Sequence, residues 1–111
     1  MRNATQNANN GENKMSTVFY TNDIEVMLEK GGFRASAVKI LSAASVPVCS
    51  FDLQNAGAVY GRFGMTALGA SRVIAVLCLN GLLSRSYNSL SMPMYQRTAR
   101  GSQRLKELNE V

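Results

Sequence analysis

Arginine dominates the chemistry that the second half of this sequence can perform. No Asp or Glu occurs between Asp52 and Glu107, and the basic residues within that stretch are mostly arginine. A guanidinium group pairs with phosphate oxygens and with the acceptor edge of guanine, so this composition favours a polyanionic partner. The basic residues of the stretch are Arg62, Arg72, Arg85, Arg97, Arg100, Arg104 and Lys106.

Residues for most enzyme chemistry are missing or wrongly spaced. The sequence has no histidine, no phosphate-binding Gly-Lys-Ser/Thr motif and no carboxylate pair, so we expect no enzyme activity, no metal and no cofactor. The two cysteines lack the spacing of a zinc site. We expect Cys78, inside an apolar helical pattern, to be a buried reduced thiol. Cys49 precedes a predicted helix, where a redox-sensing thiol is the alternative.

The elements that must position the arginines belong to one domain. A length of 111 residues with 46% apolar content predicts a single globular core. Residues 1–16 are Asn-rich and polar, so we expect a disordered tail followed by one domain at 17–111. No apolar run is long enough to cross a bilayer, and the first residues lack the apolar core of a signal peptide. We therefore expect a cytoplasmic protein with no membrane partner.

Apolar spacing predicts helices over most of the chain. We expect helices at 22–30, ended by Gly31-Gly32, at 35–45, ended before Pro47, and at 51–62. The next helix follows Thr66 as its N-cap and ends at Gly81. Its expected core positions are Ala70, Val73, Ile74 and Leu77.

The pattern changes after Gly81. Short strands at about 82–87 and 93–97, joined through 88–92, predict a β-hairpin, and a last helix follows at 100–110. The chain is thus expected to be mainly α with a small β-hairpin, an α+β fold. Three helices followed by a two-stranded wing make a winged helix-turn-helix, here with additional N- and C-terminal helices.

Several short motifs strengthen this interpretation. They are Asn80-Gly81-Leu82-Leu83, then Ser84-Arg85-Ser86, then Thr98-Ala99-Arg100-Gly101 at the start of the last helix. With these motifs, the segment 35–108 resembles the DNA-binding domain of the multiple-antibiotic-resistance and arsenic-resistance repressor families of bacteria. Two features depart from the family pattern: Arg97 stands where a leucine is usual, and Gly57 and Gly61 interrupt the preceding helix.

The resemblance implies that the N-terminal turns of the helix after Thr66 enter the major groove of double-stranded DNA, while the wing contacts phosphate or the minor groove. Arg72 is the residue expected to reach a base edge, and Arg62 and Arg97 are expected phosphate contacts. The predicted DNA-binding residues are Arg62, Thr66, Ala67, Leu68, Ser71, Arg72, Arg85, Tyr87, Asn88, Ser89 and Arg97.

Two-fold symmetry is common among such regulators, so we also expect a homodimer. Another face of the helix after Thr66 carries Leu68, Arg72, Val76 and Leu79, and its apolar residues need cover from the chain itself or from a partner. Apolar stripes on the two terminal helices are the expected dimer interface. These stripes are Ile24, Met27 and Leu28, and Leu105, Leu108 and Val111.

Three functions remain open on this basis. The first is a transcriptional regulator, a repressor, that binds a specific double-stranded sequence as a dimer. The second is a plasmid or phage adaptor that binds repeated DNA sites during segregation or replication. The third is a protein–protein interaction module built on a winged-helix scaffold.

Overall fold

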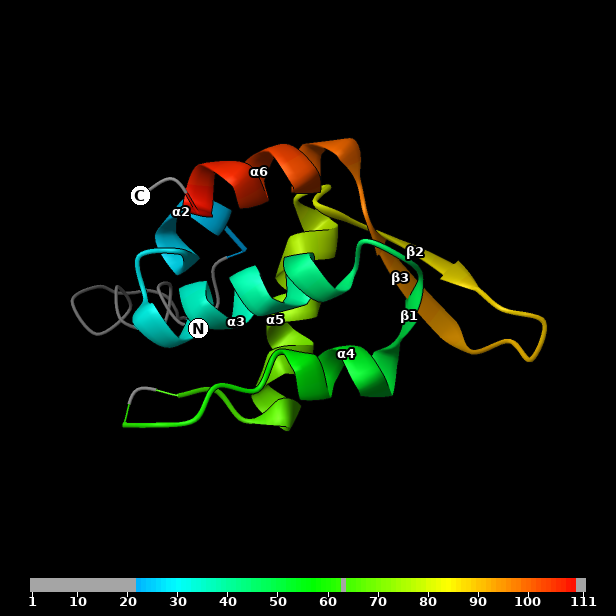
Figure 1. Cartoon of the computed structure of the whole chain (residues 1–111), viewed down its shortest axis with the longest axis horizontal. Coiled ribbons are helices and arrows are strands. Elements are labelled where there is room, and N and C mark those ends of the chain that lie inside the picture. Colours follow the sequence, from blue (N-terminus) through cyan, green and yellow to red (C-terminus); the bar gives the residue numbers. More distant parts are fainter. Residues whose placement is uncertain (1–21, 63, 110–111) are drawn as a thin grey trace, which may run out of the picture.

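A computed structural model of the chain describes residues 22–62 and 64–109, which form helices and a small antiparallel sheet (Figure 1). The mixed α+β architecture agrees with the sequence-based prediction at this level. In chain order the elements are α2 (Ile24–Met27), α3 (Gly31–Ala43), β1 (Val48–Cys49), α4 (Ser50–Ala56), α5 (Ala67–Leu79), β2 (Leu83–Tyr87), β3 (Pro93–Arg97) and α6 (Ala99–Asn109).

The predicted hairpin is present as β2 and β3, and it projects from the helices at one end of the molecule (Figure 1). The sheet has the order β1-β3-β2, with both neighbouring pairs antiparallel. Strand β1, which lies between α3 and α4, was not predicted. It has two residues, too few for an alternating apolar pattern, and it exists because Val48 and Cys49 pair with Tyr95 and Met94 of β3.

The core lies between α3 and α5, which cross near the middle of the molecule (Figure 1). All four predicted core positions of α5 are buried, from Ala70 to Leu77. They pack with Ile40 and Leu41 of α3 and with Leu53 of α4. The helical period of the sequence therefore identified the buried side of α5 correctly.

Local capping sets both ends of α5. The Thr66 hydroxyl accepts the Gly69 amide hydrogen at 2.9 Å, as an N-cap residue does. At the other end Gly81 has φ of 76°, a left-handed conformation that suits glycine. The amide of Leu82 then donates to the Leu77 carbonyl at 2.9 Å, which satisfies a carbonyl at the helix end and directs the chain into β2.

The first two predicted helix boundaries were wrong. Asp23 accepts the amide hydrogens of Glu25 and Val26 and caps only a single turn, so α2 is shorter than the predicted 22–30. Lys30 is extended, and α3 begins at Gly31, although Gly31-Gly32 was expected to end a helix. The early start places Phe33 in the core, and burial of this large side chain offsets the low helix propensity of the glycines.

Helix α4 ends at Ala56 and does not continue to residue 62 as predicted. A Cβ atom on Gly57 would lie 2.7 Å from Ile40 Cδ1 and 2.9 Å from Ala70 Cβ, so glycine permits the close approach of α4 to α3 and α5. Beyond Gly57, residues Val59 and Met65 form an isolated antiparallel bridge. Residues 57–62 and 64–66 therefore form a loop that this bridge narrows and that leads to the first turn of α5.

Helix α6 is fixed by Thr98 and Gly101. The Thr98 hydroxyl donates to the Gly81 carbonyl at 2.7 Å and accepts the Gly101 amide hydrogen at 2.9 Å, so Thr98 is the N-cap of α6. Gly101 lies against the Leu82 carbonyl so closely that a side chain would not fit. This steric reason for glycine was not anticipated from the sequence.

Candidate nucleic-acid interface

The first turns of α5 face solvent. Leu68 is 80% exposed, and Thr66 and Arg72 are exposed with it. Ala67 and Ser71 are partly exposed. The expected outward orientation of this turn is therefore confirmed, and the predicted contact residues of α5 are accessible from outside.

Thr66 and Ser71 keep hydrogen-bonding capacity beyond the bonds they make within the helix. Thr66 Oγ1 accepts from the Gly69 amide, so its own hydrogen is available to an acceptor such as a phosphate oxygen. Ser71 Oγ donates to the Leu68 carbonyl at 2.6 Å, so its lone pairs are available to a donor such as a base amino group. The front of α5 can thus both donate and accept.

Arg85 is held on one face of the hairpin by two aromatic rings. Tyr95 is its partner in β3 and Tyr87 lies two residues along β2, so the three side chains share a face. The guanidinium carbon lies 5.3 Å from the centre of the Tyr87 ring and 5.9 Å from that of Tyr95. This cation–π attraction restrains the side chain and leaves its N–H groups able to donate to an anion.

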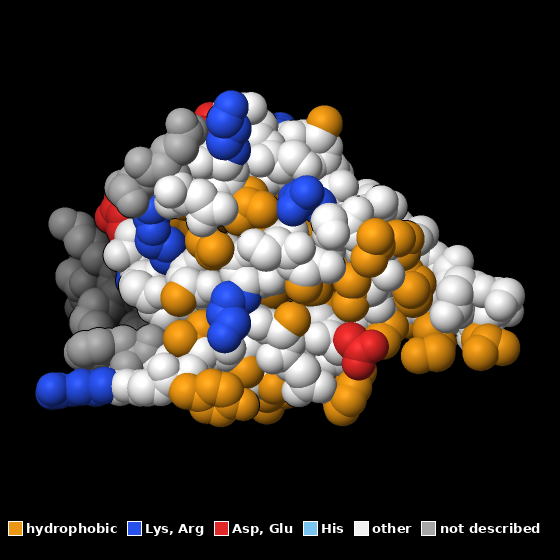
Figure 2. Space-filling model, viewed as in Figure 1, with side chains coloured by type: hydrophobic (Ala, Val, Ile, Leu, Met, Phe, Trp, Pro, Cys, Tyr) orange, Lys and Arg blue, Asp and Glu red, His pale blue; other side chains and the backbone are white. Residues whose placement is uncertain are grey.

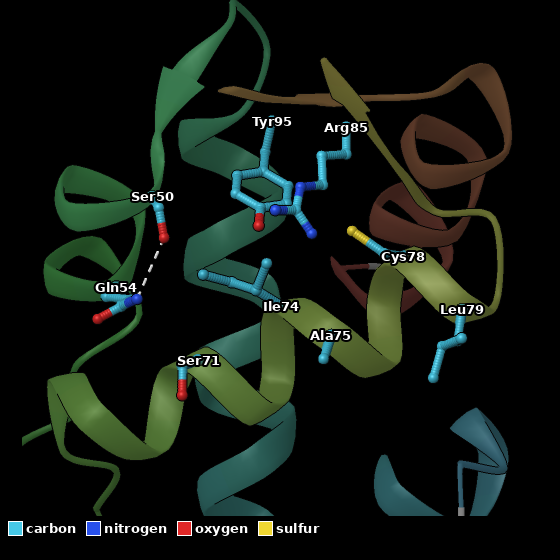
Figure 3. Close-up of a pocket in the computed structure, with 9 residues that line it drawn as sticks. All are labelled: Ser50, Gln54, Ser71, Ile74, Ala75, Cys78, Leu79, Arg85 and Tyr95. Carbon is cyan, nitrogen blue, oxygen red and sulfur yellow. Dashed lines mark hydrogen bonds between the residues drawn. The ribbon is translucent and has the colours of Figure 1, made fainter. Parts of the chain in front are cut away.

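A hollow of about 330 Å³ lies between α4, α5 and the hairpin, and we call it the α5–hairpin groove (Figure 3). Ser71 and Arg85 both line it, so the structure brings a predicted residue of α5 together with one of the hairpin. Ser50 and Gln54 of α4 form another wall, where Gln54 Nε2 donates to Ser50 Oγ at 3.2 Å. These two residues were not predicted, because nothing in the neighbouring sequence indicates that α4 borders the groove.

Cys78 also lines this groove, and both cysteines are free. Burial raises the pKa of the Cys78 thiol, and the neighbouring Arg85 guanidinium opposes part of that rise. The raised pKa keeps the thiol protonated near neutral pH, where it is a weak nucleophile. Cys78 is half-buried, more exposed than predicted. Within residues 22–62 and 64–109, no group of three His, Cys, Asp or Glu is placed to hold a metal ion.

The tip of the hairpin is a fixed turn with apolar side chains outside. Asn88 Oδ1 accepts the amide hydrogens of Leu90 at 2.9 Å and Met92 at 3.0 Å. Leu90 is 77% exposed, Met92 and Ser89 are exposed, and apolar side chains lie along the projecting hairpin in Figure 2. Asn88, a predicted DNA contact, therefore shapes the turn. Leu90 and Met92 were not predicted, because nothing in the sequence of a short polar loop indicates that its apolar residues are exposed.

Arg62 and Arg72 lie outside the α5–hairpin groove. Arg62 is exposed in the loop before α5 and shares a hollow with Thr66 and Ala67 at the N-terminal end of that helix. Arg72 is exposed on α5 and lines a separate, largely apolar hollow together with Lys30 and other residues. The predicted contacts thus surround the front of α5 on several sides.

Arg97 requires a correction. Its Nε donates to Ser102 Oγ at 2.7 Å, and one terminal nitrogen donates to the Leu41 carbonyl at 3.0 Å. These bonds turn the guanidinium toward α3 and α6, so we exclude Arg97 from the candidate interface. Arg97 thus ties β3 to both helices.

The predicted dimer stripes also need revision. Met27, Leu28 and Leu108 are buried within the chain, and Ile24 and Leu105 pack against the same core. Val111 lies outside the described residues. The core of a single chain therefore covers the described members of both stripes, which need no second copy to bury them.

The face of α5 that carries Leu68, Arg72, Val76 and Leu79 is partly buried and partly exposed. Val76 is completely buried within its own chain, whereas Leu79 is 66% exposed. The chain itself therefore covers Val76 and leaves Leu79 exposed to solvent or to a partner.

Comparisons with protein-family models, with curated proteins and with solved structures find no match for the chain. In the described part of the chain, no helix is long and apolar enough to cross a membrane.

Proposed function

We propose that this protein is a winged-helix protein that binds a specific double-stranded DNA sequence and acts as a transcriptional repressor. The observation that carries the proposal is the solvent-exposed N-terminal turn of α5 beside a hairpin whose Arg85 is restrained over two tyrosines. A helix in the major groove with an arginine-bearing hairpin on the flanking backbone is the arrangement by which winged helices bind duplexes.

Charge supports the same proposal. The exposed Arg62, Arg72 and Arg85 surround the front of α5, and no acidic residue occurs between Asp52 and Glu107. A surface with one sign of charge attracts a polyanion over several ångströms, and such binding weakens as salt screens it. Arg34 bonds to the Leu108 carbonyl and Arg104 to Glu25 and Glu107, so these two arginines join elements of their own chain.

Two copies on an inverted repeat belong to the proposal, since a single unit of this size buries little area on DNA. The contact between copies would use surfaces other than the stripes of α2 and α6. DNA footprinting distinguishes a repressor from a segregation or replication adaptor. Protection of one inverted repeat supports a repressor, whereas protection of an array of repeats supports an adaptor.

The central test is binding to a fluorescent random-sequence duplex, measured by anisotropy over a series of salt concentrations. We expect tight binding at low salt and a steep loss on adding salt. Arg85→Ala should reduce the slope of log affinity against log salt by about one contact, or ~0.9. Lys106→Ala removes the same charge from exposed α6, which does not line the groove, and should leave the slope unchanged. Absence of duplex binding at low salt would overturn the proposal.

A protein-interaction module is the second candidate. The exposed Leu90 and Met92 favour it, because apolar side chains at a rigid tip suit an apolar pocket on a protein. The experiment above separates the two candidates, since an interaction module needs no affinity for a random duplex.

A further inference from the structure

The side of α5 that faces away from the core carries mostly apolar side chains. Leu68, Arg72, Ala75 and Leu79 recur at helical spacing on that side and are exposed, and we call them the α5 outer face. Arg72 is the only charged residue in α5. The opposite side of α5 is buried in the core through residues such as Val73 and Leu77, so the fold fixes which side chains of α5 point outward.

Cations border this apolar face at both ends. Arg85 lines the α5–hairpin groove together with Ala75 and Leu79, and Arg62 shares a hollow with Ala67 near the start of the helix. An apolar protein surface would gain little from these cations. A duplex is complementary to both features, because its phosphates flank a groove that contains apolar methyl groups.

The largest apolar group that base pairs present in the major groove is the C5 methyl of thymine. Leucine and alanine cannot replace the hydrogen bonds that water makes with base amino, carbonyl or ring nitrogen groups, so covering those groups is costly. The small side chains of Ala67 and Ala75 let the backbone of α5 come close to the groove. We infer that the α5 outer face recognises thymine methyl groups, with Leu68 and Ala75 as the main contacts.

This inference rests on the proposed function and adds a substrate class, a target rich in thymine at the positions that face α5. Arg72 adds a guanine to this target, because an arginine side chain donates two hydrogen bonds to the acceptor atoms of guanine. The expected target therefore combines thymines with a guanine.

The test uses the duplex enriched by this protein from a random library, resynthesised with deoxyuridine in place of thymidine. This change removes the C5 methyl and keeps every Watson–Crick hydrogen bond. We expect affinity to fall by about fourfold for each methyl that the helix covers, the effect of one buried methyl-sized group. The salt dependence should not change, because the phosphates are the same.

Leu68→Ala should remove much of the difference between thymine and uracil duplexes. Val46→Ala shortens another exposed apolar residue, in the turn after α3, and should keep the difference intact. Equal affinity of the wild-type protein for the two duplexes would overturn the inference and leave DNA binding standing. Failure to bind any duplex at low salt would overturn the proposed function itself.

Discussion

At the scale of single residues, the structure assigns tasks that residue type alone does not reveal. Arginine is the clearest example: Arg97 and Arg104 bond to groups of their own chain, whereas Arg85 lies over tyrosine rings on the surface. Glycine is another. Gly57 fills a site with no room for a side chain, and Gly31 begins a helix with open space around it.

Replacing Gly57 by alanine tests this difference. The new methyl would lie 2.9 Å from the Ala70 Cβ, which cannot rotate away, so α4 must move outward. We expect Gly57→Ala to lower the free energy of unfolding by about 1–3 kcal/mol, measured by urea denaturation. Gly31→Ala is the matched control and should leave stability unchanged or raise it by up to about 1 kcal/mol, because alanine favours helix. Equal stability of the two variants would contradict the close packing of α4.

At the scale of elements, a few hydrogen bonds fix the turns that join α5, the hairpin and α6 beside the candidate interface. Thr66 starts α5, Gly81 turns the chain into the hairpin, and Thr98 joins the end of the hairpin to α6. Because Thr98 bonds to both Gly81 and Gly101, the two ends of the hairpin are fixed to one another.

Thr98→Val keeps the shape of the side chain and removes its hydroxyl. The Gly101 amide and the Gly81 carbonyl then lose a partner, and we expect a loss of about 1–2 kcal/mol in the free energy of unfolding. Thr98→Ser retains the hydroxyl and should retain most of the stability. Should Thr98→Val unfold at the same urea concentration as the wild type, the hydroxyl would contribute nothing to the junction.

At the scale of the whole molecule, ionic contacts join helices from the two ends of the described chain. Arg104 of α6 pairs with Glu25 of α2 at 2.6 Å and with Glu107 at 2.8 Å. Hydrogen bonds from Arg104 and then Gln103 lower the pKa of Glu107 below its ordinary value. Among the arginines of the described chain, Arg34, Arg97 and Arg104 therefore join α6 to α2 or α3, whereas Arg62, Arg72 and Arg85 are exposed around the front of α5.

The Glu107 contact predicts a pH dependence. A carboxylate whose pKa is lowered by folding stabilises the native state above its unfolded pKa, ordinarily near 4.5, and this contribution disappears as the pH falls through the folded pKa. We expect the wild type to have a higher Tm than Glu107→Gln at neutral pH, with the difference vanishing in acid. Arg104→Gln should lose the same pH dependence. A Tm difference that is constant with pH would count against the contact.

The sequence alone determined the features that neighbouring residues control. The ends of α5, the hairpin and the cap of α6 depend on bonds spanning a few positions, and the buried side of α5 follows from a period of 3.6 residues. For the same reason, the outward turn at Leu68 was predictable, since it lies opposite the core positions.

Only the tertiary structure decided what depends on distant parts of the chain. Gly57 has no room for a side chain because α3 and α5 approach it, and β1 exists because β3 lies beside it. The covered stripes of α2 and α6, the inward Arg97 and the exposed Leu79 likewise depend on which elements lie against them. Capping hydrogen bonds and helical periodicity depend on residues close together in the sequence. The exposure of a side chain depends on packing between segments that are far apart in the sequence.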